Sequence, residues 1–445
     1  MNPYFGYEIA GLVVAAYIVI VYALYLGGYI GPDRTFSFFG PALMIKTTRG
    51  RSALDRWGRF RRFWAVAADV GIFLSIIAMA AIVVLLLLGA VVSLRISPSQ
   101  APSPQEALGL PGINPIIPIG YGIVALVVGI VVHELWHGIV ARSQKIGVKS
   151  LGILWCVVPV GAFVEQNEEE MMAAPRRRRD RVAAAGVLAN FVLTVIFFAV
   201  LSLIIAGSIA PNANGVGVAY VQSNSPAANA SIASGDIITV INGTEITSAS
   251  TFESVMSKTV PNETVNVSFY VASTGTTVTV PVKLAPSPTV AGRGFLGVAP
   301  AALTPAELKQ TLVWPLGSSF GPATGAVDWI VLPLAGLEPV SGSTAGYFHL
   351  TGPFAHADPT WFWIGVNLLY WLAWMNLLLG ISNALPLFPL DGGLLFRDYA
   401  ATLASRVKRG WSEARVEAFA GRAVAVSSVL VLILLAWQFV VPRLL

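Results

Sequence analysis

The sequence predicts a polytopic α-helical membrane protein with about six transmembrane helices, a membrane-associated β-hairpin and an inserted, mostly-β domain. Of its 445 residues, 55% are hydrophobic and only 11% are charged, whereas about 25% of the residues of soluble proteins are charged. Six apolar runs are long enough to cross about 30 Å of hydrocarbon. They lie near 8–30, 65–94, 116–141, 182–207, 361–385 and 418–441.

Basic clusters predict the orientation of these helices. Residues 46–62 hold seven Lys and Arg residues and one Asp, and loops rich in Lys and Arg are typically cytoplasmic. Alternation from this loop places the clusters at 142–149, 175–181 and 405–410 on the same, cytoplasmic side, and places 208–360 outside. The net charge of +5 therefore indicates topology rather than a nucleic-acid partner.

The N-terminus and the cysteine content exclude some simpler interpretations. The first residues lack the basic region and the clear cleavage site of a signal peptide, so we expect the N-terminus to be retained. The single cysteine, Cys156, excludes an internal disulfide and a Cys-rich metal site.

The stretch 150–165 interrupts the pattern of membrane-crossing helices. It is apolar but too short to span a bilayer, and Pro159 and several glycines argue against a helix. We expect a re-entrant or membrane-buried β-hairpin, which is tolerable only where protein covers its backbone. An interfacial loop is the alternative.

Residues 212–287 predict a soluble, mostly-β domain. They are rich in Ser, Thr, Asn, Val and Gly, and the alternating runs 264–271 and 276–284 are typical of strands. Within them, 221–246 resembles the core of a PDZ domain, through Ser225-Pro226-Ala227-Ala228, Ser234-Gly235-Asp236-Ile237-Ile238 and Ile241-Asn242-Gly243. PDZ domains bind extended peptide C-termini by strand addition. A spacer or steric filter is the alternative role.

The metal-binding pattern lies in the third apolar run. The uncharged stretch 116–131 leads directly into His133, Glu134 and His137, which form the pattern H-E-x-x-H. Ionisable residues at bilayer depth are costly and usually mark function. Histidines at i and i+4 share one helix face and can reach one Zn²⁺ ion, while Glu134 can take a proton from zinc-bound water. The alternative is a structural role, in which the three polar groups are hydrogen-bonded inside a helix bundle.

A catalytic zinc also needs a third protein ligand and an open fourth position. His349 and His356 lie across the membrane from His137 in the predicted topology. Asp391 is the better candidate, because it closes the fifth apolar run at the depth of His137. An Asp that only caps a proline-broken helix end is the alternative.

The residues before and after Asp391 predict an irregular helix end. Pro386 and Pro389 are expected to unwind the helix, and Gly392 and Gly393 allow close approach of the backbone.

Together these motifs resemble the site-2 protease family of intramembrane metalloproteases. That family pairs H-E-x-x-H with N-x-x-P-x-x-x-x-D-G on another core helix, and Asn383, Pro386, Asp391 and Gly392 fit this spacing. A third element, A-G-P-x-x-N, appears at 185–190 with Ala185, Gly186 and Asn190 in place but with valine at the proline position. An extracytoplasmic PDZ insertion between the second and third core helices is also a family feature.

The resemblance implies an intramembrane zinc metalloprotease that cleaves single-span membrane proteins within or near their transmembrane segments. Zinc would be held by His133, His137 and Asp391, with Glu134 as general base and then acid. Asn190 and Asn383 could bind the substrate backbone or support a ligand, and the active site would lie near the cytoplasmic side. The hairpin at 150–165 could offer an edge strand to an unwound substrate.

Two other classes of function compete with this one. A zinc-binding transporter or sensor would need a path of intramembrane polar residues, but the polar side chains concentrate near one depth. A silent scaffold that recognises partners through its PDZ domain would need a broken metal or base motif, yet Glu134 is intact.

The predicted organisation has five parts. Residues 1–94 form two N-terminal helices with their basic loop, and 95–207 form core helices with the hairpin. The PDZ-like domain covers 212–287, and an extracytoplasmic Pro/Gly-rich segment with apolar patches such as 328–337 covers 288–360. The last pair of helices covers 361–445.

Overall fold

The chain folds into two compact units. The computed structural model describes residues 5–31, 34–40, 42–107, 109–156, 158–313, 340 and 342–445. The helical unit comprises Met1–Val195 and Leu372–Leu445, and the β unit comprises Ile196–Trp371. Two long helices, α6 (Arg176–Ser208) and α12 (Pro359–Asn383), contain the boundary between the units.

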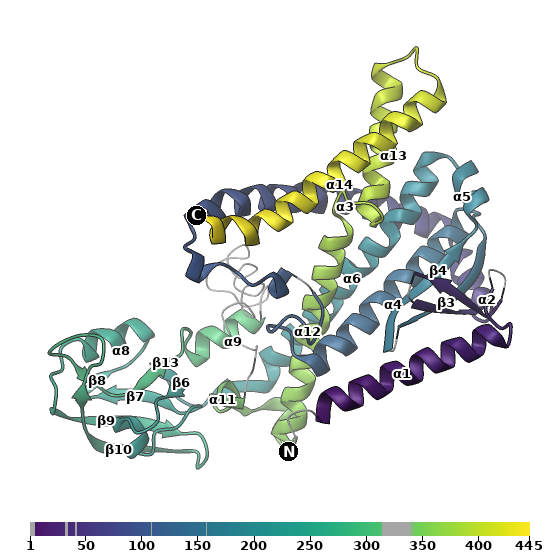
Figure 1. Ribbon diagram of the computed structural model, residues 1–445. Helices are drawn as coiled ribbons and strands as arrows, with labels where there is room; N and C mark the ends of the chain where they lie inside the picture. The colour runs from purple at the N-terminus through teal and green to yellow at the C-terminus, as the bar shows by residue number, and fades with distance from the viewer. Residues whose placement is uncertain are drawn as a thin grey trace. The chain divides into compact units, whose positions relative to one another are not determined.

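Long apolar helices dominate the helical unit (Figure 1). Besides α6 and α12, its described helices are α1 (Phe5–Leu26), α2 (Arg51–Gly58), α3 (Arg61–Val92), α4 (Ile119–Ser143), α5 (Glu168–Ala173), α13 (Asp391–Val407), α14 (Glu413–Leu444) and three short 3₁₀ segments at Ser93–Arg95, Pro98–Gln100 and Pro104–Ala107.

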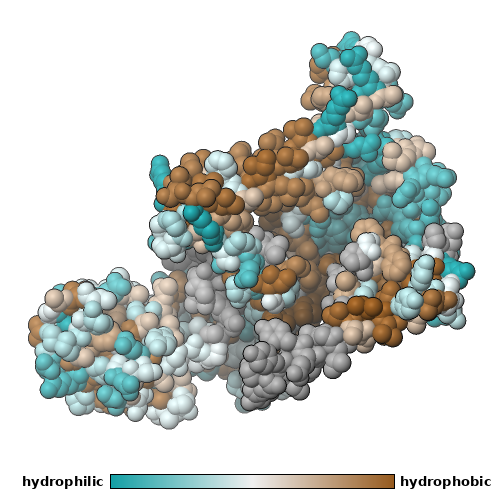
Figure 2. Space-filling view, viewed as in Figure 1, coloured by the Kyte–Doolittle hydropathy of each residue, from teal (hydrophilic) through white to brown (hydrophobic). Residues whose placement is uncertain are grey.

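Five helices in the described part of the chain are long and apolar enough to cross a membrane. They cover Arg61–Arg95, Ile119–Ser143, Arg176–Ser208, Pro359–Asn383 and Glu413–Leu444, which match five of the six expected runs. The remaining run, expected near 8–30, falls on α1 (Phe5–Leu26), which has 22 residues. Figure 2 shows hydrophobic side chains over α3 and α14, as expected of surfaces that face lipid. The chain is a multi-pass membrane protein, and a sixth span stays a prediction.

The helical conformation is interrupted between α12 and α13, where Pro386 and Pro389 predict a break. Helix α12 ends at Asn383 and α13 begins at Asp391, so the prediction that Asp391 closes the fifth span needs correction: it opens the next helix. Helix α13 was not predicted, because Asp391–Val407 is amphipathic and too polar for a membrane-spanning helix. Helices α13 and α14 form a hairpin, packed through Ala401, Ala404 and Ala420.

A four-stranded antiparallel sheet packs against α4. Its strands β1 (Phe36–Phe39), β2 (Ala42–Thr47), β3 (Val148–Cys156) and β4 (Val158–Gln166) lie in the order β1-β2-β3-β4. The hairpin expected at 150–165 is therefore present as β3 and β4. The two further strands were not predicted, because 36–47 is a short apolar segment beside a basic loop. The position of the sheet relative to the bilayer stays a prediction.

The β unit is built on a sheet of order β10-β9-β7-β6-β13, with β8 paired to β7. Its core holds Val216, Ile238, Phe252, Val267 and Phe269. Its elements are β5 (Ile209–Pro211), β6 (Val216–Val221), α7 (Pro226–Asn229), β7 (Ile237–Ile241), β8 (Thr244–Glu245), α8 (Ala249–Met256), β9 (Thr264–Val271), β10 (Thr276–Lys283), β11 (Ala285–Pro286), β12 (Gly294–Phe295), β13 (Val298–Pro300), α9 (Pro305–Val313), α11 (Gly342–Ala345), β14 (Phe348–Leu350) and a 3₁₀ turn at Gly352–Phe354.

The expected boundary of the β domain at residue 287 divides this sheet. Strand β13 pairs with β6, so the sheet continues to residue 300. The first part of the segment expected at 288–360 therefore belongs to the β domain. The polar, proline-rich stretch that separates β10 from β13 hid this pairing in the sequence. The apolar patch expected at 328–337 lies outside the described residues.

The three pieces that resemble a PDZ core form a capped helix, a turn into a strand and a tight turn, while the assignment of the domain to the PDZ type stays a prediction. The Ser225 hydroxyl accepts a hydrogen bond from the Ala228 amide and caps α7. The buried Asp236 carboxylate accepts hydrogen bonds from the amides of Ala233 and Ala272 just before β7. Asn242 and Gly243, both with positive φ, turn the chain from β7 into β8.

Candidate metal centre

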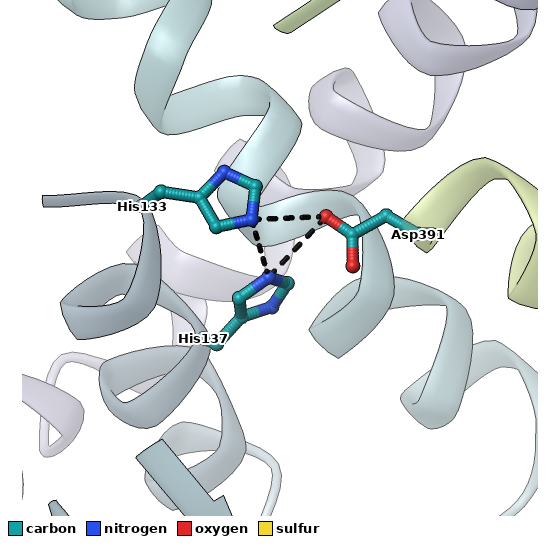
Figure 3. Close-up of side chains that lie close together, drawn as sticks. All are labelled: His133, His137 and Asp391. Atoms are coloured by element: carbon teal, nitrogen blue, oxygen red, sulfur yellow. Dashed lines mark hydrogen bonds and ion pairs between the residues drawn. The ribbon is translucent and has the colours of Figure 1, made fainter. Parts of the chain in front are cut away.

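Three side chains from α4 and α13 point toward one another (Figure 3). His133 and His137 come from α4, and Asp391 comes from the first residue of α13. The Nε2 atoms of the two histidines lie 3.1 Å apart, and each lies 3.3 Å from Asp391 Oδ2. Both histidines are buried. The structure thus brings together the three ligands that the motifs predict.

Helix α6 closes this cluster on another side. Its Gly186 faces the two histidines, and a Cβ at this position would lie well inside van der Waals contact of His133 Nε2 and His137 Nε2. The glycine of the A-G-x-x-x-N element therefore leaves the space in which an ion bound to both Nε2 atoms would lie.

The hydrogen bond of His137 fixes its tautomer. Its Nδ1 lies 2.7 Å from the carbonyl oxygen of Val182 in α6, and a carbonyl can only accept. The Nδ1 atom therefore carries the proton, and the lone pair of Nε2 faces His133 and Asp391. Sequence reasoning missed Val182, because a backbone acceptor leaves no trace in the residue type.

Asn190, also on α6, contacts the other histidine. Its side-chain amide lies 3.1 Å from His133 Nδ1, and its Oδ1 atom is buried without a hydrogen-bond partner in the described part of the chain. Exchanging the amide oxygen and nitrogen by a half-turn would give Oδ1 a donor in His133 Nδ1–H. That arrangement leaves His133 Nε2 free to bind a metal, so of the two roles expected for Asn190, support of a ligand has the geometry.

The cluster fits a zinc ion by its donors and by its unsatisfied oxygen. Asp391 Oδ2 is buried without a hydrogen-bond partner among the described residues, although burying an unpartnered carboxylate oxygen is costly. One ligand atom from each of the three residues lies within 4.8 Å of the others. Two imidazole nitrogens and one carboxylate oxygen form a typical catalytic zinc set.

Glu134 lies beside this cluster without belonging to it. Its Oε2 atom accepts a hydrogen bond of 3.0 Å from the Val164 amide in β4. Helix α4 thus carries two candidate metal ligands, His133 and His137, and between them a carboxylate that is hydrogen-bonded to the neighbouring sheet.

The hydrogen bonds and close contacts of the remaining predicted residues lie between the end of α12 and the start of α13, and none of them reaches the three clustered side chains in the described part of the chain. Asn383 donates to the Leu379 carbonyl within α12, 3.0 Å away. The Pro386 carbonyl accepts from Ser427 of α14, 2.8 Å away. A Cβ on Gly392 would clash with the Ala384 carbonyl, so only glycine lets α13 begin this close to the end of α12. Ser427 was not predicted, since a serine in an apolar span has no distinctive pattern.

Fold and site together define a multi-pass membrane protein with a buried His-His-carboxylate centre of the catalytic zinc type. Comparison with known proteins is consistent with this class. Residues 121–431 match the family model described as peptidase family M50. The chain belongs to peptidase family M50, the site-2 protease family of zinc metalloproteases.

Individual relatives are distant. An uncharacterized protein of Methanocaldococcus jannaschii is 27% identical over 313 residues, which cover 70% of this chain and 65% of that protein. A Clostridium acetobutylicum protein named "Putative zinc metalloprotease" is 25% identical over 308 residues, or 62% of this chain and 84% of that one. Metalloprotease MmpA of Caulobacter vibrioides is 25% identical over 352 residues, or 64% of this chain and 86% of that protein.

Proposed function

We propose that this chain hydrolyses peptide bonds within or near the transmembrane segments of membrane-tethered substrates, as an intramembrane zinc metalloprotease. The observation that carries the proposal is the convergence of His133, His137 and Asp391 on one buried point between helices long enough to span a bilayer. A soluble substrate has poor access to such a point, whereas a helix in the same membrane can approach it laterally.

The residues around the cluster would have different roles in hydrolysis. A bound zinc ion would act as a Lewis acid for the scissile carbonyl and would activate a water molecule. Val182 and Asn190 hold the two imidazoles in the orientation that presents Nε2. Glu134 would take the proton of the attacking water and pass it to the leaving amine nitrogen, with the Val164 amide keeping its carboxylate in place.

The sheet supplies a place for an unwound substrate. Peptide bonds inside a helix are shielded by their own hydrogen bonds, so the substrate must become extended before hydrolysis. Strand β4 is an edge of the four-stranded sheet, and its Val164 amide already donates to Glu134. An extended segment added along β4 would therefore lie next to the proposed general base.

The β unit would select substrates rather than take part in the reaction. The Asp236 contacts and the Asn242–Gly243 turn support a PDZ-like fold for it, and we place it outside the cytoplasm, where it would bind peptide C-termini or exclude substrates with large outer domains. Removal of 212–300 should leave cleavage of a trimmed substrate intact and change the rate for an untrimmed one. Loss of cleavage of both substrates would show that the unit belongs to the catalytic machinery.

The direct test is proteolysis by the purified protein. Candidate single-span substrates are incubated with the protein in detergent or vesicles, with and without a chelator, and cleavage is followed by mass spectrometry. We expect cleavage that stops with chelator and returns with zinc. Glu134→Gln should retain zinc and lose activity by about 10²–10⁴-fold. Chelator-insensitive cleavage, or near-normal turnover by Glu134→Gln, would contradict the proposal.

A further inference from the structure

The four-stranded sheet is polar at one end and apolar at the other. At the polar end Thr47 pairs with Leu151, and Ser150 pairs with Glu165, beside Lys46 and Lys149. At the opposite end the exposed side chains are aromatic, namely Phe38, Phe39 and Trp155. Lys149 and Trp155 are six residues apart on β3, and about 3.3 Å per residue makes roughly 20 Å, comparable with one leaflet of a bilayer.

A cavity of about 550 Å³ lies at the polar end. Four basic side chains line it, together with the hydroxyls of three threonines and of Ser150, and the only acidic side chain in its lining is Glu165. The basic residues are Arg34, Lys46, Arg49 and Lys149. Lys46 is 3.3 Å from Glu165, whereas the other three form no ion pair in the described part of the chain. The cavity thus has a clear excess of positive charge.

An adjoining cavity of about 620 Å³ connects this charge to apolar surface. It shares Lys46, Lys149 and Glu165 with the first cavity, and it is also lined by Ile30, Phe38, Met44 and a second acidic residue, Glu168. The basic side chains Arg34, Lys46, Arg49 and Lys149 still outnumber the two acidic ones in the pair of cavities. The lining of the second cavity contains Ser37, which is only 6% exposed and whose hydroxyl has no hydrogen-bond partner among the described residues. A buried hydroxyl without a partner is costly, so a polar group of a ligand is expected there.

We propose that this pair of cavities, which we call the basic pocket, binds an anionic phospholipid. The lipid phosphate would lie among Arg34, Arg49 and Lys149, the glycerol region near Ser37, and the start of the acyl chains along Phe38 and Met44. Charge complementarity calls for an anion. The apolar side chains of the second cavity favour a lipid over a free phosphate ion, because acyl chains gain free energy from contact with apolar surface and a phosphate ion does not.

The test measures lipid binding to the full-length purified protein. Delipidated protein is titrated with phosphatidylglycerol or with phosphatidylcholine, and bound lipid is counted by native mass spectrometry. The variant Arg49→Glu/Lys149→Glu reverses two charges of the pocket. Arg56→Glu/Arg62→Glu is the matched control, since both residues are exposed arginines that line neither cavity.

We expect the wild-type protein to prefer phosphatidylglycerol. Each basic residue near an anionic surface contributes appreciably, so the pocket variant should bind that lipid at least about tenfold more weakly, and the control within about twofold of wild type. The neutral variant Arg49→Gln/Lys149→Gln should fall between them, which guards against a folding defect caused by charge reversal.

Three results would overturn the proposal. Equal binding of the two lipids would show that the headgroup charge is not recognised. An equal loss of phosphatidylglycerol binding in the pocket and control variants would show that the lipid responds to the overall positive charge and not to this pocket. Displacement of phosphatidylglycerol by millimolar inorganic phosphate, at constant ionic strength, would assign the site to a free anion. The measurement needs no proteolysis, so its outcome is independent of the proposed function.

Discussion

At the scale of single residues, the proposed metal site depends on contacts that a third helix makes with the two imidazoles. His133, Glu134, His137 and Asp391 stand out because ionisable side chains are rare in apolar helices. The partners of the two imidazoles, Val182 and Asn190, come from a third helix. Such contacts depend on the packing of α6 against α4, which one sequence does not reveal.

Gly186 should be indispensable for zinc binding. Gly186→Ala would place a methyl group against His133 Nε2 and His137 Nε2, so at least one histidine must move. We expect purified Gly186→Ala protein to contain little zinc by elemental analysis while still folding. Gly207→Ala, on the same helix, is the control, because nothing lies within 4 Å of its added Cβ. Full zinc content in Gly186→Ala would disprove this placement of the ion.

Asn190 should act as an orienting acceptor for His133. Asn190→Leu removes the acceptor and should weaken zinc binding by about 10–100-fold, as loss of a hydrogen bond to a metal-bound histidine typically does. Asn190→Asp restores an oxygen and should bind zinc within a few-fold of wild type. Affinity is measured by competition with a chromophoric chelator, with Thr194→Val as a control one turn away. Wild-type affinity in Asn190→Leu would rule out the orienting role.

At the scale of elements, long helices were easier to predict than short strands. Five apolar runs match helices, and the prolines of 383–393 mark the break between α12 and α13. Strands β1 and β2 have four and six residues, too few to show a period. Strand β2 pairs with β3, which lies far along the chain, so that Leu43 is opposite Trp155. Element length thus decided which parts of the helical unit could be predicted.

The sheet should respond to pH through Glu165. Burial raises the pKa of its carboxyl, but the Ser150 hydroxyl and the Lys46 ammonium outweigh burial and hold the pKa below its ordinary value of 4.5. A lowered pKa means that the ionised carboxylate stabilises the fold above about pH 4.5, and that this stabilisation is lost as the pH falls through the folded-state pKa.

Glu165→Gln should therefore lower the apparent melting temperature at pH 7 and have progressively less effect below pH 4.5. The control is Glu169→Gln, since Glu169 is exposed and makes no ion pair among the described residues. Differential scanning fluorimetry of the purified protein across this range tests the prediction. A difference between wild type and Glu165→Gln that stays constant with pH would contradict it.

At the scale of the whole molecule, the family could be recognised from two motifs that lie far apart in the chain. H-E-x-x-H and the Asp391 motif are separated by 245 residues, 138–382. They belong together because two histidines alone leave a catalytic zinc without its third ligand. The limit of the β unit could not be recognised in this way, because the pairing of β13 with β6 depends on tertiary structure.

The basic clusters predict one orientation of the whole chain, and labelling of single cysteines can test it. In a Cys156→Ala background, Arg56→Cys introduces a thiol in the basic loop and Ser250→Cys introduces one in the β unit, and both positions are exposed. Loops rich in Lys and Arg stay in the cytoplasm, so a membrane-impermeant maleimide should reach residue 56 only after the cells are opened. It should reach residue 250 in intact cells. The reverse pattern would invert the predicted orientation. Labelling of both positions in intact cells would place the basic loop and the β unit on the same side of the membrane, and the number of spans between them could then not be odd.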